Sequence, residues 1–474
     1  MGYDYDVVVI GAGAAGLVAA TGAAGLGART ALIEKDKLGG ACTWSGCIPS
    51  KTLLKSAQIF SLLKRAKAFG ISGDIKCSPD GVMVHVRDIV KEVSRHHPPE
   101  LFERRGIKVL FGQPRFIDRR LIEMNGSRIL SKRFIICTGS HPLVPDIEGL
   151  EEAGYLTNEN IFDLQVFPKS IAVLGAGPIG VEISQALSRL GVEVSIIETA
   201  DRILFREDKE AADVLAKALL REGVKLYTGK RAVKFSREKD SISIILEDRD
   251  KKRLSVRTEK VLVAAGRQPN TAGLDLEKAK VKYSNKGIEA DETLKTTACN
   301  IYACGDVVGP YQFSHMAEYQ AIIAACNSLL PFKQRVDYHA VPWVTFSDPE
   351  VAHLGLTEEE ASQRHRNIKV YRSAYARNDR AVTDMEKEGF AKVICDRKGY
   401  ILGAHIAGAE AGEILHEYVL AKSLKLKLKK LSSVIHAYPT LSQVVKSSAD
   451  AYYLNIFLSS WFKKISRFFI RFLR

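Results

Sequence analysis

The sequence predicts an α/β fold in which one strand–turn–helix–strand unit occurs twice. Residues 5–34 and 171–198 each read as an apolar strand, a glycine-rich turn, a helix and a second strand that ends in a glutamate. The chain has 474 residues, enough for about three domains at roughly 150 residues each. Its composition, 46% hydrophobic and 26% charged, is that of a globular protein with a sizeable core. Together these observations predict two Rossmann-like domains and leave residues for a third.

The first unit begins with a β-branched strand at 7–10 and runs into the turn Gly11-Ala-Gly13-Ala-Ala-Gly16. In such a turn Gly11 permits the sharp bend, Gly13 lets the backbone approach a pyrophosphate, and Gly16 allows close packing of helix on strand. The N-terminus of the following helix then faces the negative phosphates. Glu34 ends the second strand, where it is placed to accept hydrogen bonds from ribose hydroxyls.

The second unit repeats this pattern with Gly175, Gly177 and Gly180 in the glycine positions and Glu198 in the acidic one. In both copies the glutamate stands 23 positions after the first glycine. A single such turn is weak evidence, but two in the same context predict two dinucleotide sites. The Glu198 carboxylate would accept a hydrogen bond from a free 2′-hydroxyl and repel a 2′-phosphate, and no arginine follows it directly. NADH is therefore favoured over NADPH.

Charge and cysteine content exclude several classes of function. The net charge is +14, but the basic residues are scattered and accompany no zinc finger or RNA-recognition motif, so no nucleic-acid partner is predicted. The eight cysteines follow no framework pattern, which favours a reducing, cytoplasmic compartment over secretion. Asp4 and Asp6 precede the apolar N-terminal run, where a signal peptide carries positive charge. No stretch approaches the roughly 20 apolar residues of a membrane-spanning helix.

Two cysteines, Cys42 and Cys47, stand close together in GGACTWSGCIPSK at 39–51. A zinc site normally needs a second close pair, which the sequence lacks, so no metal site is predicted. A structural disulfide gains least from closing a short loop and is unusual in a reducing compartment. A redox-active pair needs a reactive thiolate, and the helix predicted after the glycines would lower a thiol pKa at its N-terminus. The redox interpretation is favoured.

The spacing of this pair also predicts its backbone. Residues five apart in a regular α-helix have Cα atoms roughly 8–9 Å apart. A disulfide tolerates at most about 7 Å. We therefore expect the backbone between Cys42 and Cys47 to depart from a regular helix, with Gly46 helping it to do so.

Nearly the whole chain resembles the FAD-dependent pyridine nucleotide–disulfide oxidoreductases, which include dihydrolipoamide dehydrogenase, glutathione reductase and mercuric reductase. The cysteine segment and the two nucleotide fingerprints give the first matches. Further matching segments are FIICTGSHP at 134–142, VLVAAGRQPN at 261–270, IYACGDVVG at 301–309 and PWVTFSDPEVAHLGLT at 342–357.

The resemblance implies that FAD lies on the first fingerprint, with Asp306 at its ribityl or phosphate region, and that NAD(P)H lies on the second. It makes Cys47 the charge-transfer thiolate beside the flavin and Cys42 the thiol that attacks the substrate. Lys51 would lie near the flavin N5 and pair with Glu182, whose alternative interpretation is a surface helix residue. The resemblance also places Gly139, Gly266 and Ser314 at the cofactor sites.

Two other cysteines, Cys137 and Cys304, lie in apolar segments flanked by glycine. We interpret them as packing residues rather than redox partners.

The C-terminal acid/base segment departs from the family pattern. Relatives that act on disulfides carry a histidine before the proline and a glutamate five residues later. Here the segment is HAYPTLSQ, with Tyr438 and Gln443 in those positions and His436 two residues early, where we expect it to point elsewhere. A tyrosine with a pKa near 10 is a poor base at neutral pH. Losing a general acid/base costs roughly 10²–10⁴ in rate.

The candidate acceptor is therefore not a linear disulfide. Metal ions such as Hg(II) or Cu(II), a quinone, oxygen or an unusual disulfide remain open. The protein resembles mercuric reductase, but its last cysteine is Cys395, so the metal-delivering C-terminal pair is missing. The alternative is a dihydrolipoamide dehydrogenase-like subunit of a 2-oxoacid dehydrogenase complex.

The family order predicts the domains and a homodimer, because the region around Tyr438 would reach a partner subunit. Residues 1–145 and 271–340 would form the FAD domain, 146–270 the NAD(P) domain, and 341–451 an α+β dimerisation domain.

A basic aromatic tail, 452–474, follows these domains. Its cations and apolar residues repeat at helical spacing, and it has no acidic residue. The cations are Lys463, Arg467, Arg471 and Arg474, and the apolar stripe is Phe457, Trp461, Ile465, Phe468 and Phe472. Such a helix suits an anionic membrane surface. A helix packed on the dimer interface is the alternative.

Overall fold

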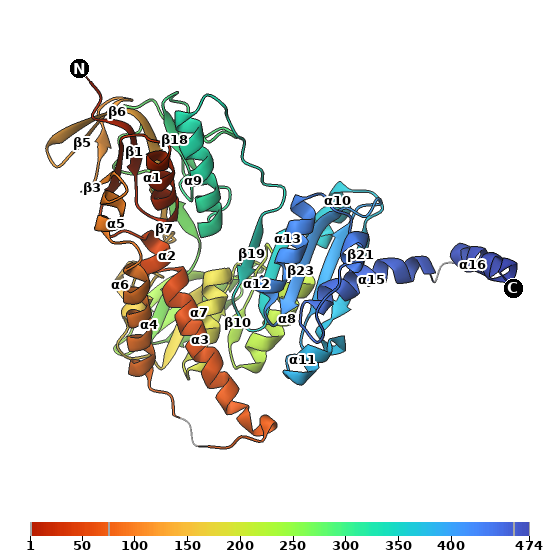
Figure 1. Cartoon of the computed structure of the whole chain (residues 1–474). Helices are drawn as coiled ribbons and strands as arrows, with labels where there is room; N and C mark the ends of the chain where they lie inside the picture. The colour runs from red at the N-terminus through yellow and green to blue at the C-terminus, as the bar shows by residue number, and fades with distance from the viewer. Residues whose placement is uncertain (1, 74–75, 458–459, 474) are drawn as a thin grey trace. The chain divides into compact units, whose positions relative to one another are not determined.

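The computed structural model describes residues 2–73, 76–457 and 460–473, and it shows the predicted mixed α/β fold (Figure 1). The chain folds into two compact units. Unit 1 comprises Met1–Gly175, Arg189–Glu193 and Arg231–Asp337. Unit 2 comprises Ala176–Ser188, Val194–Lys230 and Tyr338–Arg474. The domain boundaries expected from the sequence divide the chain more finely and stay a prediction.

The main sheet of unit 1 has seven strands, in the order β3-β2-β1-β6-β5-β4, with β18 also paired to β6. Strands β1 to β3, β6 and β18 are mutually parallel, whereas β4 and β5 add an antiparallel meander. The strands are Tyr5–Ile10, Thr30–Glu34, Ile107–Phe111, Arg115–Phe116, Leu121–Met124, Ser127–Ile136 and Ile301–Ala303, in the order β1 to β6 and β18.

Successive residues of β1 enter two different cores because strand side chains alternate between the faces of a sheet. Val7 and Val9 pack with helices α1 (Ala14–Gly25) and α9 (Ser314–Leu329), which lie side by side in Figure 1. Val8 and Ile10 pack on the opposite face with residues of the meander. Parallel strands buried on both faces read as unbroken apolar runs, and VVVI fits that rule.

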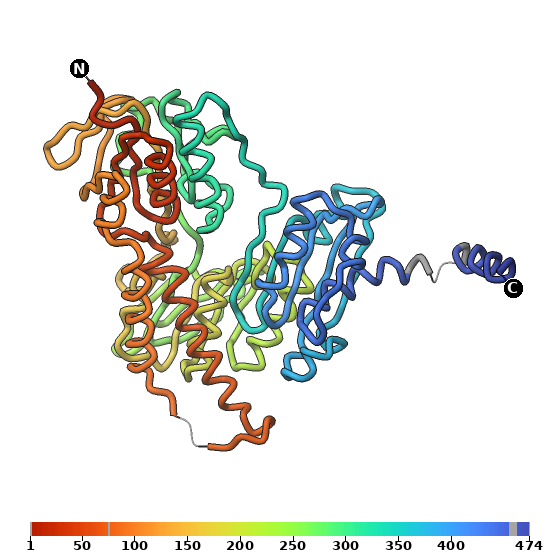
Figure 2. The backbone as a smooth tube through the Cα atoms, viewed as in Figure 1, coloured from red at the N-terminus to blue at the C-terminus, as the bar shows by residue number. Residues whose placement is uncertain are grey.

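The rest of unit 1 is built from helices beside the cysteine segment and from smaller sheets. Helices α3 and α4 lie side by side (Figure 2). The helices are α2 (Gly40–Trp44), α3 (Cys47–Lys64), α4 (Pro79–Ser94), α5 (Pro99–Glu103) and α6 (Leu150–Ala153), with 3₁₀ turns at Ala66–Phe69 and Ile161–Asp163. The strands are β7 (Ser140–Pro142), β8 (Ser170–Leu174), β11 (Lys230–Arg237), β12 (Ile242–Asp248), β13 (Arg253–Thr258), β14 (Lys260–Val263), β15 (Arg267–Pro269), β16 (Tyr283–Ser284) and β17 (Gly287–Ile288).

Unit 2 is centred on a five-stranded antiparallel sheet in the order β19-β20-β23-β22-β21. Its core joins that sheet to helices α13 and α15. The strands are β9 (Glu193–Ile197), β10 (Lys225–Tyr227), β19 (Pro342–Thr345), β20 (Glu350–Gly355), β21 (Lys369–Ala374), β22 (Phe390–Cys395) and β23 (Ile401–Gly408). The helices are α7 (Pro178–Arg189), α8 (Lys209–Arg221), α10 (Glu358–Arg364), α11 (Asp379–Thr383), α12 (Ala411–Ile414), α13 (His416–Ser423), α14 (Lys429–Ser432), α15 (Gln443–Phe457) and α16 (Ser460–Phe472), with a 3₁₀ turn at Tyr375–Arg377.

Candidate redox and nucleotide sites

The first glycine-rich turn is shaped by contacts that leave no room for side chains. Gly11 has φ +98°, and a Cβ on it would lie 2.5 Å from the carbonyl oxygen of Cys137. A Cβ on Gly16 would lie 1.7 Å from the carbonyl oxygen of Gly11. Gly13 caps the N-terminus of α1, and a Cβ on Gly40 would come within 2.6 Å of its Cα. The bare backbone at this helix N-terminus fits the pyrophosphate of FAD.

The second turn repeats the first in detail. Gly175 has φ +105°, and a Cβ on it would lie 2.4 Å from the carbonyl oxygen of Ala264, which follows β14. A Cβ on Gly177 would meet no atom within 4 Å, so this backbone is open to a ligand. Gly180 is buried within α7.

The two glutamates occupy equivalent positions in the two copies. Glu34 accepts a hydrogen bond from Ala12 N at 2.7 Å, and Glu198 accepts one from Ala176 N at the same distance. In each case the donor is the residue after the first glycine. The other carboxylate oxygen of Glu198 accepts from Ala200 N at 2.8 Å. Each carboxylate is thus fixed at the rim of its turn, as recognition of a ribose requires.

Asp306 belongs to a polar cluster that the sequence did not reveal. Ser140 Oγ donates to Asp306 Oδ2 at 2.6 Å, and Arg267 Nε donates to Ser140 Oγ at 2.7 Å. Arg267 Nε also lies 3.7 Å from Asp306 Oδ2. Gly139 and Gly266, which precede these residues, have positive φ values of 69° and 129°. The only sequence signal for Ser140 and Arg267 is their position beside those glycines.

The backbone between Cys42 and Cys47 leaves the helix, as predicted. Helix α2 ends at Trp44, and α3 begins at Cys47. Between them Gly46 has φ −126° and ψ −111°, and a Cβ on it would lie 2.8 Å from the carbonyl oxygen of Ala41. The pair therefore spans a break between two helices, with Cys47 as the first residue of α3.

The two thiols have different surroundings. Cys47 is the first residue of α3 and so lies at the positive end of that helix dipole. Its Sγ lies 3.6 Å from the Oγ of Ser314, which is the first residue of α9. A hydrogen bond to Cys47, burial and the negative charge of Cys47 together raise the pKa of the Cys42 thiol far above its ordinary value. The raised pKa of Cys42 favours keeping its proton when the pair is reduced.

The other two residues assigned near the flavin lie in different units. Lys51 is half-buried on α3 in unit 1. Glu182 lies on α7 in unit 2, is 4% exposed, and accepts a hydrogen bond from Phe346 N at 2.8 Å. The burial of Glu182 contradicts its interpretation as a surface residue, whereas its pairing with Lys51 stays a prediction.

The acid/base segment places a phenol where relatives carry an imidazole. Tyr438 is 68% exposed, and its hydroxyl donates to Asp379 Oδ2 at 2.8 Å. This hydrogen bond and the charge of Asp379 raise the pKa of Tyr438 further above neutrality. Gln443, the first residue of α15, donates to Ala437 O at 3.4 Å.

His436 points away from this segment into unit 2. Its Nδ1 faces Val434 O at 3.0 Å, and its Nε2 lies 2.7 Å from Glu417 Oε1. Its side chain is 4% exposed. The imidazole is therefore buried beside Glu417 of the same unit and is not presented at the surface beside Tyr438.

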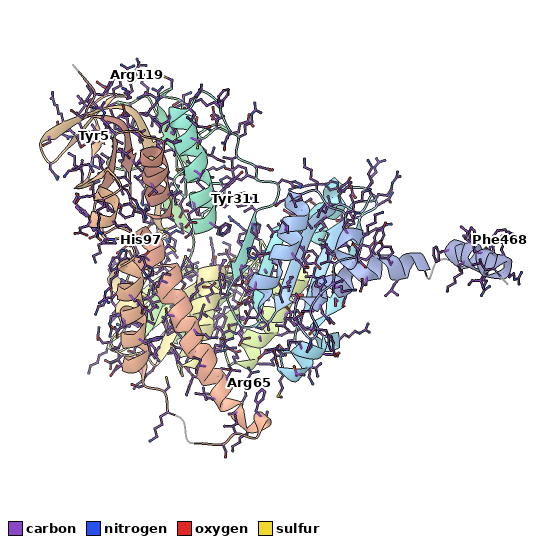
Figure 3. The ribbon with its side chains drawn as sticks, viewed as in Figure 1. Tyr5, Arg65, His97, Arg119, Tyr311 and Phe468 are labelled. Atoms are coloured by element: carbon purple, nitrogen blue, oxygen red, sulfur yellow. The ribbon has the colours of Figure 1, made fainter. Side chains whose placement is uncertain are left out.

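Helix α16 exposes both its cations and its apolar side chains. Lys463, Arg467 and Arg471 are all exposed. Phe468, which is labelled in Figure 3, is 66% exposed, and Phe472 is 82% exposed. The side chains of Phe457 and Trp461, and Arg474, lie outside the described residues. Over the described part of the chain, none of the helices combines the length and apolarity needed to cross a bilayer.

Comparison with known proteins yields one family for most of the chain. The family model described as "Pyridine nucleotide-disulphide oxidoreductase" matches residues 5–321, and that of its dimerisation domain matches 341–449, which supports a homodimer. The chain is 33% identical to a mercuric reductase of Bacillus cereus over 449 residues, covering 94% of this chain and 71% of the relative. It is 35% identical to a dihydrolipoyl dehydrogenase of Corynebacterium glutamicum over 463 residues, covering 94% and 97%.

Solved structures give the same result. The HOCl-induced flavoprotein disulfide reductase RclA from Escherichia coli matches with a TM-score of 0.85 at 28% identity, covering 94% of this chain and 99% of that one. A Cu(II) complex of RclA matches with a TM-score of 0.83, covering 93% and 98%.

Proposed function

The chain belongs to the pyridine nucleotide-disulphide oxidoreductase family and is a flavoprotein oxidoreductase. On this premise we propose that its electron acceptor is a thiophilic metal ion, Cu(II) or Hg(II), rather than a linear disulfide. The proposal rests on Tyr438. A leaving thiolate needs an acid/base with a pKa near neutrality, and this position instead carries a phenol whose pKa is raised. A metal ion releases no thiolate that must be protonated. Mercuric reductases among the relatives and the Cu(II) complex of RclA support this choice.

The residues divide the work of electron transfer. Bound FAD would accept a hydride from the nicotinamide and deliver two electrons to the disulfide. Cys47 holds the resulting thiolate at the N-terminus of α3 beside Ser314. Cys42 binds the metal ion and loses its proton on doing so. Closing the disulfide again releases two electrons, which reduce two Cu(II) to Cu(I) or one Hg(II) to Hg(0).

NADH is the proposed electron donor. Glu198 presents a carboxylate at the second turn, where a 2′-phosphate would be repelled. The nearby Arg202 guanidinium donates to the carbonyl oxygens of Leu204, Phe205 and Glu207 at 2.8–3.0 Å, so these donors are already used by the backbone.

The acceptor is tested by steady-state NADH oxidation with the purified full-length protein. We expect turnover with Cu(II) or Hg(II) and a lipoamide rate lower by about 10²–10⁴, the usual contribution of a general acid/base. Tyr438→His should raise the lipoamide rate alone, and Tyr400→His, at another exposed tyrosine of unit 2, should change neither rate. Cys42→Ser should abolish metal reduction while NADH still bleaches the flavin. Rapid lipoamide turnover by the natural protein would reject the proposal.

The alternative function is that of a dihydrolipoamide dehydrogenase-like subunit of a 2-oxoacid dehydrogenase complex. Its support is the length match, because the chain covers 97% of the dihydrolipoyl dehydrogenase but 71% of the mercuric reductase. The lipoamide assay above decides between the two functions.

We further propose that α16 binds an anionic membrane surface at the inner face of the membrane. Lys463, Lys464, Arg467 and Arg471 supply positive charge, and the exposed side chains of Phe468 and Phe472 supply apolar area that lipid can cover. The charge complementarity favours lipid over a second copy of this chain, which has a net charge of +14.

Co-sedimentation with phosphatidylglycerol and phosphatidylcholine vesicles tests this second proposal. We expect binding to the anionic vesicles only, and loss of binding in Arg467→Glu/Arg471→Glu. Lys429→Glu/Lys430→Glu on α14 makes the same charge change elsewhere and should leave binding intact. Equal binding after removal of 460–474 would reject the proposal. A weaker dimer without 460–474, together with no vesicle binding, would assign α16 to the interface.

A further inference from the structure

A second pair of sulfur atoms lies in the core of unit 1, away from the break between α2 and α3. Cys137 and Cys304 are 167 positions apart in the chain, yet their Sγ atoms are 3.4 Å apart. Cys137 is 5% exposed and Cys304 0% exposed. The sequence indicated packing residues at both positions, and the fold places the two side by side.

Strand pairing holds the two cysteines in register. Strands β6 and β18 are parallel partners, with Ile136 opposite Ala303, and each cysteine directly follows its strand. Cys304 N donates to Ile136 O at 3.0 Å, so the ladder continues to this position. Neighbouring strands lie about 4.7–4.9 Å apart. This separation falls within the Cα–Cα range of about 4.4–6.8 Å that a disulfide accepts.

The pair joins two segments that the candidate FAD site uses. Gly139 and Ser140 follow Cys137 by two and three residues, and Asp306 follows Cys304 by two. Ser140 and Asp306 are themselves hydrogen-bonded at 2.6 Å. The carbonyl oxygen of Cys137 also lies against Gly11, at the first turn. A covalent bond between the sulfurs would therefore link the segment that carries Ser140 to the segment that carries Asp306.

We propose that Cys137 and Cys304 form a second, oxidisable thiol pair. A small uncharged two-electron oxidant such as hydrogen peroxide converts this pair to a disulfide. The disulfide links the two segments that carry Ser140 and Asp306 at the candidate FAD site. The Cys137 sulfur attacks one peroxide oxygen, the O–O bond breaks, and a sulfenic acid and water form. The Cys304 sulfur then attacks the sulfenic sulfur, the S–O bond breaks, and a second water leaves. Two thiols and one peroxide thus give one disulfide and two waters.

Burial sets the order of reaction. Because both cysteines are buried, a charged oxidant would have to lose its hydration to reach them. Burial and the neighbouring Cys304 raise the pKa of Cys137, so its sulfur is mostly the less nucleophilic thiol. We therefore expect Cys137 and Cys304 to oxidise more slowly than Cys42 and Cys47.

Peptide mapping of the oxidised full-length holoenzyme tests the pair directly. Reduced protein is treated with increasing hydrogen peroxide, its free thiols are alkylated, and it is digested without reductant. We expect a linked peptide containing Cys137 and Cys304 to appear after the Cys42–Cys47 disulfide, and dithiothreitol to remove it. If the folded protein gives no linked peptide at doses that oxidise the exposed Cys299, or forms it only in urea, the proposal is overturned.

Thermal unfolding and FAD release test this link between the two segments. Oxidation should raise the unfolding midpoint by several degrees and slow FAD release at least several-fold, since a cross-link over a long loop constrains the unfolded chain. Cys304→Ala should lose both responses, whereas Cys395→Ala, at an equally buried cysteine of unit 2, should keep them. The wild-type peptide map remains decisive if a variant fails to fold. A lower midpoint or faster FAD release after oxidation would overturn the proposed link.

Discussion

Single residues in this protein act through what surrounds them rather than through their identity alone. Cys42 and Cys47 are the same residue type five positions apart, yet only Cys47 begins a long helix. A hydrogen bond to Cys47, burial and the charge of Cys47 raise the pKa of Cys42. The different roles that we propose for the two cysteines rest on this asymmetry.

Removing the Cys47 sulfur should lower the pKa of Cys42. In Cys47→Ser the hydrogen bond to the Cys47 thiolate and its negative charge, two causes that raise this pKa, are absent, and burial remains. The pH dependence of Cys42 alkylation by iodoacetamide should therefore have a lower midpoint in Cys47→Ser than in the reduced wild type. Because burial remains, this midpoint should stay above that of a free cysteine. An unchanged or upward midpoint would show that Cys47 does not raise the pKa of Cys42.

At the scale of elements, each nucleotide turn is defined by contacts between backbone atoms. The same two features recur in both copies: a first glycine with positive φ against a carbonyl oxygen, and a glutamate that accepts from the next residue at 2.7 Å. These contacts explain why the spacing of 23 positions is repeated. A side chain at the wrong glycine should break the element as a whole.

Two glycines of helix α1 provide a matched test. A Cβ on Gly16 would lie 1.7 Å from Gly11 O, whereas a Cβ on Gly25 would meet nothing within 4 Å. We expect Gly16→Ala to displace the turn, lose FAD from the purified protein and lower the urea midpoint. Gly25→Ala should be neutral or stabilise by up to about 1 kcal/mol, because alanine restricts the unfolded chain. Flavin absorbance per chain and urea denaturation measure both effects. Full FAD retention in Gly16→Ala would contradict the proposed role of the turn.

At the scale of the whole molecule, unit 2 combines residues from the ranges that the two family models match, and a cluster of charged side chains joins them. Lys392, 1% exposed on β22, lies 2.5 Å from Asp208 and 3.1 Å from Glu358. Asp208 caps α8, within the range of the first family model, and Lys392 and Glu358 lie within the dimerisation domain. The contact couples these two parts of the chain into one compact unit.

Lys392→Ala should destabilise the protein by about 3–5 kcal/mol, because it leaves the buried Asp208 carboxylate without its cation. Lys398→Ala, at an exposed lysine in the turn after β22, should change the unfolding free energy by less than about 0.5 kcal/mol. Urea unfolding at neutral pH compares the two. Similar effects of both substitutions would show that the cluster contributes little.

The sequence by itself determined the α/β class, the family, both glycine-rich turns and the break between Cys42 and Cys47. These features depend on local rules: strand periodicity, glycine at positions that admit no Cβ, and the reach of a disulfide across five residues. It also located the departure at Tyr438, which needs only a comparison of positions. Each of these inferences involves residues close together in the chain.

Tertiary structure alone decided the features that join distant segments. The cluster of Ser140, Arg267 and Asp306 and the 3.4 Å approach of Cys137 to Cys304 depend on strand pairing, whereas the inward orientation of His436 depends on its packing beside Glu417 of helix α13. No local pattern encodes which strand lies beside β6, because that choice minimises exposed apolar surface over the whole sheet. For this reason the proximity of two cysteines that the sequence indicated as packing residues is visible only in the folded chain.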